Sequence, residues 1–342
     1  MKKTISLFIL LLPAGITYIR AQDPHFSQFF EAPLLRNPSL AGIFDGDVRI
    51  QGVYRTQWGS VTVPYQTGSL AAEVKKPIGS NNDFITMGMQ LLYDRAGTVN
   101  LATTYVMPAV NYHKALRDDK TKYLSLGIMG GLVQRSFDRS KVTTNNQYDG
   151  FGYNPSLSDG ELFANNRYSY ADGSIGLSFN SSIAERVQDN YYLGIAYHHL
   201  NRPKNSFYKN PEVELNAKWE LSGGVKLTAG ETSFVTVYAN YTRQGSYNET
   251  LVGALYGYKI GDDPEEPQYT VQFGAVIRAK DAIIPVVKLD YKPFSLVCSY
   301  DANLSRLKTS GTVANAFEIS LSYAAFSDRY NSSKNAVACP RF

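Results

Sequence analysis

The sequence predicts an all-β fold, a transmembrane antiparallel up-and-down β-barrel of about fourteen strands that follows an N-terminal signal peptide. Three observations favour this fold. Apolar residues alternate with small or polar residues in many short segments, no apolar run after residue 22 is long enough for a spanning helix, and 25 of the 342 residues are tyrosine. Tyrosine carries an apolar ring and a polar hydroxyl, and therefore suits the interface between lipid and water.

Residues 1–21 have the pattern of a secretory signal peptide, with two lysines, an apolar run from Ile5 to Ile19 and cleavage expected after Ala21. Of the 34 basic residues, three lie in this leader, which leaves 31 basic against 30 acidic residues. The mature chain therefore has no net charge that would attract nucleic acid or an acidic substrate.

Period-two patterning locates the strands, because a barrel strand in lipid must be apolar outward at every second residue. The clearest case is the last segment, where Phe317, Ile319 and Leu321 alternate with polar residues. The same pattern predicts fourteen strands: 47–57, 65–74, 84–95, 99–113, 121–137, 168–180, 190–200, 215–228, 232–242, 247–260, 268–279, 283–292, 294–303 and 314–324.

An even strand number places both ends of the barrel, residues 47–324, on one side of the membrane. The longest predicted connections, 138–167, 201–214 and 304–313, then share the opposite side, which we expect to face outward. The C-terminal tail, 325–342, is expected in the periplasm. Strand one must pair with strand fourteen, because hydrocarbon cannot satisfy an open sheet edge.

The segment 22–46 precedes the barrel and does not read as a strand. Its apolar residues are interrupted by Pro24, Pro33 and Pro38. The segment is too apolar to remain solvated and too rich in proline for a long helix. We hypothesise that it folds into the barrel lumen as a partial plug, or that it docks on a periplasmic partner.

Residues suited to chemistry do not form a recognisable site. The histidines His25, His113, His198 and His199 lack the spacing of a metal motif, and adjacent strand residues point to opposite faces, so the last two are not expected to share a metal. No serine lies on a nucleophile elbow, and no helix follows the glycines of 127–131 to bind a phosphate. We therefore predict no enzyme activity, no cofactor and no metal.

Two alternatives remain open for the cysteines, Cys298 and Cys339. In the oxidising periplasm a disulfide between them would tie the tail to the penultimate strand. However, Cys298 lies in a row of residues that we predict to face lipid, where such a bond is geometrically unfavourable.

Short motifs at both ends of the mature chain suggest a family. The opening Asp23-Pro24-His25-Phe26-Ser27-Gln28-Phe29, then Asn37-Pro38-Ser39-Leu40-Ala41-Gly42 and Tyr54-Arg55-Thr56-Gln57-Trp58, resemble the DPxFSQF, NPAxAG and YRxQW patterns of the PorP/SprF family. Further similarities to this family occur at His198–Lys204, at Tyr300–Ser305 and at the terminal Cys339–Phe342.

The resemblance implies an outer-membrane barrel of a Gram-negative bacterium that takes part in type IX secretion, the route by which Bacteroidetes export adhesins, gliding proteins and hydrolases. The implied partners are outer-membrane lipid and either periplasmic secretion components or an exported surface adhesin, between which the sequence does not choose, with no nucleic acid. The alternative function is transport of small molecules, as in porins or fatty-acid transporters. We predict partner binding by Phe26, Phe29, Phe30, Trp58, Pro340, Arg341 and Phe342.

Overall fold

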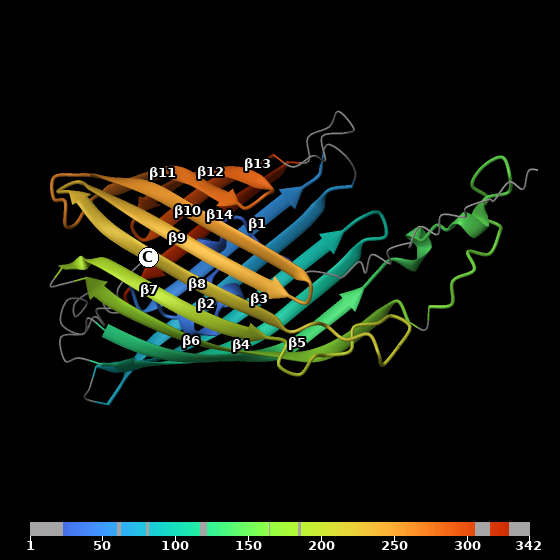
Figure 1. Ribbon diagram of the computed structural model, residues 1–342, viewed down its shortest axis with the longest axis horizontal. Coiled ribbons are helices and arrows are strands. Elements are labelled where there is room, and N and C mark those ends of the chain that lie inside the picture. The colour runs from blue at the N-terminus through green and yellow to red at the C-terminus, as the bar shows by residue number, and fades with distance from the viewer. Residues whose placement is uncertain are drawn as a thin grey trace, which may run out of the picture.

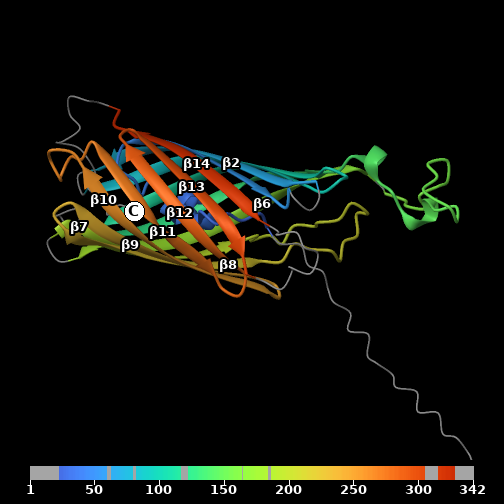
Figure 2. The same ribbon diagram turned by 90° about the horizontal axis from the view of Figure 1, so that it is seen from above.

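The computed structural model describes residues 23–59, 63–79, 82–116, 122–163, 165–183, 186–304 and 315–327. Within them, fourteen antiparallel strands form one closed barrel, in which each strand pairs with its neighbours in sequence and β1 pairs with β14 (Figure 1, Figure 2). The predicted fold class and strand number are confirmed. No helix in the described part of the chain is long and apolar enough to cross a membrane.

The strands agree with their predicted ranges to within a few residues at each end. They are β1 Val48–Gln57, β2 Tyr65–Ile78, β3 Asp83–Ala96, β4 Leu101–Ala115, β5 Lys122–Ser136, β6 Arg167–Ile183, β7 Arg186–His198, β8 Lys218–Gly230, β9 Ser233–Gln244, β10 Tyr247–Ile260, β11 Tyr269–Arg278, β12 Ala282–Tyr291, β13 Phe294–Asn303 and β14 Ala316–Ala325. Short helices are η1 Phe29–Glu31, α1 Pro33–Arg36, η2 Pro38–Leu40, η3 Arg139–Lys141 and η4 Asn145–Gln147.

The two rims of the barrel differ in their connections. The chain enters β1 and leaves β14 at the same rim, because Val48 lies opposite Ala325, and we call this the terminal rim. The opposite rim, the loop rim, carries the long connections 137–166 and 199–217, as the sequence predicts. The first of these projects far beyond the strands (green in Figure 1).

Side chains alternate between lipid and lumen along each strand. On β5, Leu126 and Ile128 are exposed on the outer face, whereas Ser125 and Gly127 are buried on the inner face. Aromatic pairs lie on the outer face near both rims: Tyr269–Tyr291 and Phe294–Tyr323 near the terminal rim, and Tyr197–Trp219 near the loop rim. Such rings suit the two headgroup regions of a bilayer.

Several sequence predictions fall outside the described residues. They are the signal peptide 1–21, most of the connection 304–313, most of the tail 325–342, and Cys339. The second cysteine, Cys298, is a half-buried free thiol on β13 between the outward Leu296 and Tyr300, in the row predicted to face lipid.

The outer face of β5 provides a test of the lipid boundary. We expect Ile128→Arg, near the middle of this strand, to destabilise the barrel by roughly 2–4 kcal/mol, because it places a charge in hydrocarbon. The measurement is reversible urea unfolding in lipid vesicles. The control Leu162→Arg, on an exposed loop position, should change stability by no more than about 0.5 kcal/mol. Equal costs for the two substitutions would contradict the assigned face.

Candidate functional site: the lumen and its N-terminal segment

Residues 23–46, here called the plug, lie inside the barrel and run from one rim to the other (blue in Figure 1 and Figure 2). At the loop rim, the backbone N–H of Asp23 donates to Gln244 at 3.2 Å. At the terminal rim, Gly46 packs against Ala325, at a φ of +124° that few side chains tolerate. Of the two hypotheses for this segment, its position corresponds to the plug in the lumen.

The plug is irregular because its sequence interrupts helices as soon as they begin. Pro33 and Pro38 each stand at the start of a short helix, where the missing N–H of proline costs least. The side chain of Asn37 accepts a hydrogen bond from the N–H of Ser39 at 2.9 Å and caps η2. Many backbone groups of the plug are therefore left to bond with the barrel wall.

The first wall contact is the carboxylate of Glu318 on β14, which is fully buried. It accepts hydrogen bonds from the backbone N–H groups of Ser27 and Gln28, both at 2.7 Å. Arg55 on β1 donates to the same carboxylate at 2.8 Å. A buried carboxylate is tolerated only when it is paired and hydrogen-bonded, so the plug supplies part of what Glu318 requires.

A second carboxylate, Asp301 on β13, extends this network. It accepts a hydrogen bond from the Ser27 hydroxyl at 2.7 Å and one from Arg278 at 3.0 Å. Arg278 also lies 3.4 Å from Glu249, which in turn lies 3.4 Å from His25 of the plug. Charges on five strands are thus linked through the first residues of the plug.

Similar contacts hold the rest of the plug. Glu31 accepts hydrogen bonds from Lys288 on β12 at 2.7 Å and from Gln51 on β1 at 2.6 Å. Nearer the terminal rim, Glu73 on β2 accepts one from the N–H of Gly42 at 2.7 Å and pairs with Arg49. These contacts fix both the depth and the rotation of the plug.

The helix η2 packs against the barrel wall at Gly127 of β5, which has no side chain. A Cβ atom at Gly127 on β5 would lie 2.4 Å from the backbone of Pro38 and Ser39, closer than atoms can approach. Asn111 on β4 donates to the carbonyl of Ser39 at 2.6 Å and to that of Ala41 at 2.8 Å. The glycine is therefore required for close backbone approach.

The amino-terminal end of the plug is held by an ionic cluster at the loop rim. His199 lies between the carboxylates of Asp23, at 2.8 Å, and Asp172 on β6, at 2.7 Å, and Lys218 lies 3.3 Å from Asp23. Burial alone would lower the pKa of His199, but the two carboxylates raise it to about 9. Burial pushes the pKa of Asp23 upward, but His199 and Lys218 hold it well below its usual value.

The predicted opposite orientation of His198 and His199 is wrong. His199 has a φ of +60°, which ends the alternation of β7 and lets both rings point into the lumen, where His198 bonds to the carbonyl of Arg36 at 2.9 Å. His113 on β4 is also buried and stacks on Phe84. Among the described residues, no group of three or more His, Cys, Asp or Glu side chains is arranged to hold a metal ion.

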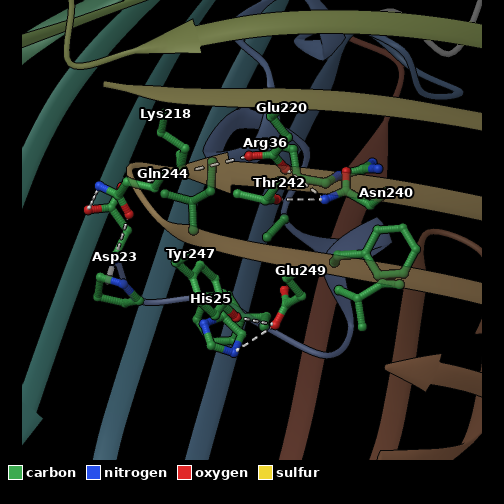
Figure 3. Close-up of a pocket in the computed structure, with 16 residues that line it drawn as sticks. Asp23, His25, Arg36, Lys218, Glu220, Asn240, Thr242, Gln244, Tyr247 and Glu249 are labelled. Atoms are coloured by element: carbon green, nitrogen blue, oxygen red, sulfur yellow. Dashed lines mark hydrogen bonds and ion pairs between the residues drawn. The ribbon is translucent and has the colours of Figure 1, made fainter. Parts of the chain in front are cut away.

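A small cavity remains beside the plug, with a volume of about 60 Å³. Figure 3 shows that polar side chains of β8, β9 and β10 face Asp23 and His25 across it. Its lining includes Lys218, Glu220 and Glu249. A polar space of this size suits a few water molecules and is far smaller than a pocket for an organic ligand.

The predicted partner-binding residues divide into three groups. Phe26 and Phe29 are buried in the lumen, and Phe30 is half-buried and stacks on Tyr238 at 5.0 Å. Trp58 is 37% exposed at the loop rim, where it packs on Tyr65 of β2. Pro340, Arg341 and Phe342 lie outside the described residues.

The alternation of apolar and polar residues did not single out the charged residues of the lumen wall, above all Arg55, Arg278, Asp301 and Glu318. The signal in the sequence that could have identified them is their position within the strands. Each occupies the inner row of a strand, where small or uncharged polar residues are otherwise frequent. A charge in such a row needs a partner within the lumen.

The closed sheet, the apolar outer rows and the aromatic rings at both rims define an integral outer-membrane β-barrel. A family model described as type IX secretion system membrane protein PorP/SprF matches residues 19–323, and the chain belongs to this family. The predicted family and the outer-membrane location are confirmed. No curated protein matches the chain.

Three solved structures with similar folds are distant from this chain in sequence. The barrel is similar to a Pseudomonas aeruginosa FadL homologue, with 10% identity, a TM-score of 0.50, and coverage of 86% of this chain and 94% of that chain. The second is the TodX monoaromatic hydrocarbon channel deltaS2 mutant, with 12% identity, a TM-score of 0.48, and coverage of 86% of this chain and 93% of that chain. The third is the translocator domain of the autotransporter NalP from Neisseria meningitidis, with 8% identity, a TM-score of 0.43, and coverage of 87% of this chain and 95% of that chain. These likenesses concern the fold alone.

The fit of η2 to the wall predicts that a larger side chain at Gly127 displaces the plug. We expect Gly127→Leu to raise the single-channel conductance in planar bilayers at least several-fold, because the leucine occupies the space of Pro38 and Ser39. The control Gly130→Leu lies on the same strand but faces lipid, where a Cβ makes ordinary contacts. Unchanged conductance in a folded Gly127→Leu barrel would show that this contact does not hold the plug.

The ionic cluster predicts that alkaline pH weakens the plug. The pKa of His199 is raised on folding, so its stabilising contribution is complete below about pH 6.5 and is lost as the pH rises through about 9. The contribution is on the order of 3 kcal/mol. We expect conductance to rise between pH 8 and 10, and His199→Gln to remove this rise. An equal rise in the variant would assign the effect to other groups.

Proposed function

We propose that the barrel is a docking component of the type IX secretion system, which binds an exported surface protein at its loop rim and secretion components at its terminal rim. In this proposal its role is binding rather than catalysis or solute transport. The single observation that carries it is the connection 137–166, a folded projection with an exposed apolar tip above a lumen that the plug fills.

This projection is here called the knob. Its base is built from packed aromatic residues. Phe137 contacts Phe163 and, from the neighbouring connection 199–217, Phe207, in both cases with ring centroids 4.8 Å apart. Arg139 lies over the Phe163 ring at 5.0 Å and pairs with Asp159 at 2.7 Å. These contacts join the two longest loops of this rim into one support.

The tip of the knob is a small hairpin closed by a bridge between Tyr148 and Tyr153. The carboxylate of Asp149 accepts hydrogen bonds from the N–H groups of Phe151 and Gly152, both at 3.0 Å, and this fixes the turn. A surface that is ordered before binding loses less entropy when a partner arrives.

Apolar side chains on the knob are not covered by other residues that the structure describes. Phe151 is 100% exposed and Leu162 is 89% exposed, and Tyr148 and Tyr153 are also exposed. Exposed aromatic side chains on an ordered loop are typical of protein interfaces. Since long loops of outer-membrane barrels face outward, a partner at this position is a protein of the cell surface, as an exported adhesin is.

The filled lumen favours docking over transport. The barrel of a small-molecule transporter needs a continuous path, whereas the plug leaves a cavity of about 60 Å³ beside it. We therefore expect the wild-type barrel to conduct poorly in planar bilayers. A stable, wide conductance in the wild-type protein would favour transport instead.

The knob can be tested by removing its exposed apolar side chains. We expect Phe151→Ser with Leu162→Ser to lower the amount of exported protein that co-purifies with the barrel by about tenfold, while barrel assembly is unchanged, because buried aromatic anchors supply much of the affinity of an interface. The measurement is quantitative mass spectrometry of proteins cross-linked to the barrel on intact cells. The matched control is Leu200→Ser with Val213→Ser, which removes two exposed apolar residues from the neighbouring loop.

If the knob variant retains every surface partner that the wild-type barrel retains, docking at the loop rim is excluded. If the control variant loses the same partners as the knob variant, the interface lies over the whole rim rather than at the tip of the knob.

A further inference from the structure

A second concave site lies on the outside of the barrel, where the connection 199–217 folds back over the ends of β7, β8 and β9. Its cavity measures about 390 Å³. The wall on the barrel side consists of three residues that are neighbours across the sheet, since Tyr197 lies opposite Trp219 and Trp219 lies opposite Arg243. The site is therefore part of the lipid-facing surface and is separate from the plug.

The aromatic residues place this cavity at the level of the lipid headgroups. Trp219 is 49% exposed and packs on Tyr197 with ring centroids 4.6 Å apart. Indole and phenol rings on the outer face of a barrel prefer the membrane interface. Farther along the same strands, toward the middle of the barrel, the exposed side chains are the aliphatic Leu193, Ile195 and Leu221. A molecule in this cavity can therefore continue into hydrocarbon.

The charges that line the cavity favour an anion. Arg243 of β9 and Arg202 of the connection both line it and are both exposed. Neither guanidinium group has a hydrogen bond, or an ion pair within 4 Å, to another described residue, in contrast to the arginines of the lumen. The carboxylate of Glu214 also lines the cavity, but it pairs with Lys204 at 2.5 Å. These four side chains together carry a net charge of +2.

We infer that this cavity binds the phosphate group of an anionic membrane lipid, with Arg202 and Arg243 on the phosphate and the acyl chains along the aliphatic outer face of β7 and β8. Guanidinium groups bind phosphate oxygens through paired N–H donors, and such contacts are strengthened beside low-dielectric lipid. The arrangement combines a charged end, an aromatic belt and an apolar track in the order that a phospholipid presents them. The inference does not depend on the proposed docking function.

The test compares lipid binding by the full mature chain in detergent, using native mass spectrometry with phosphatidylglycerol and phosphatidylcholine. We expect phosphatidylglycerol to bind more tightly to the wild-type protein. Arg202→Gln with Arg243→Gln should weaken its binding roughly 30-fold, since each basic residue near a lipid surface contributes about fivefold. The matched control, Lys209→Gln with Lys280→Gln, removes two exposed positive charges from the same rim and should bind as the wild type does.

A second measurement locates the lipid without altering the arginines. The chain contains two tryptophans, so Trp58→Phe leaves Trp219 as the sole tryptophan. Its fluorescence should be quenched more by brominated phosphatidylglycerol than by brominated phosphatidylcholine at the same mole fraction in vesicles. Equal quenching by the two lipids overturns the inference, as does unchanged phosphatidylglycerol binding in the arginine variant. Displacement of phosphatidylglycerol by an equal concentration of inorganic phosphate would show a site for small anions and not for lipid.

Discussion

The rest of the lumen depends on the pairing of buried wall charges with the plug. Glu318 is fully buried and receives two plug N–H groups and the Arg55 guanidinium. Without these partners the carboxylate would be an unpaired charge in a water-poor interior, which costs several kcal/mol. The wall needs the plug to satisfy its carboxylates, and the plug needs the wall to satisfy its backbone. This mutual requirement explains why an irregular segment occupies one defined position.

Most of the fold could be predicted from the sequence, because the alternation of apolar and polar residues reports directly which side of the sheet meets lipid. The pattern around Phe317 and Ile319 predicts an outer row, and these residues are exposed in the structure. The family motifs also predicted the location. Alternation says nothing about which inner residues meet, since Ser27 and Glu318 are 291 positions apart and come together only through barrel closure.

The error at His198 and His199 has a local cause. Strand alternation holds only while the backbone stays extended, and His199 adopts a φ of +60° at the end of β7. Sequence patterning also could not place Phe26 and Phe29, because an apolar segment outside the strands is compatible with both a lumen and a partner surface. The lumen contacts of neighbouring residues decide between these positions. The apolar side chains that suggested a partner interface are therefore buried inside the barrel.

The path of the plug also bears on the order of assembly. Two residues near its start, Ser27 and Gln28, bond to Ser299, Asp301 and Glu318, which belong to the last two strands. These two residues therefore cannot reach their final partners until the last two strands are in place. Closure of the barrel and placement of the plug in its lumen are therefore one cooperative event. A truncated barrel without β14 would then be left with an unoccupied interior as well as an open edge.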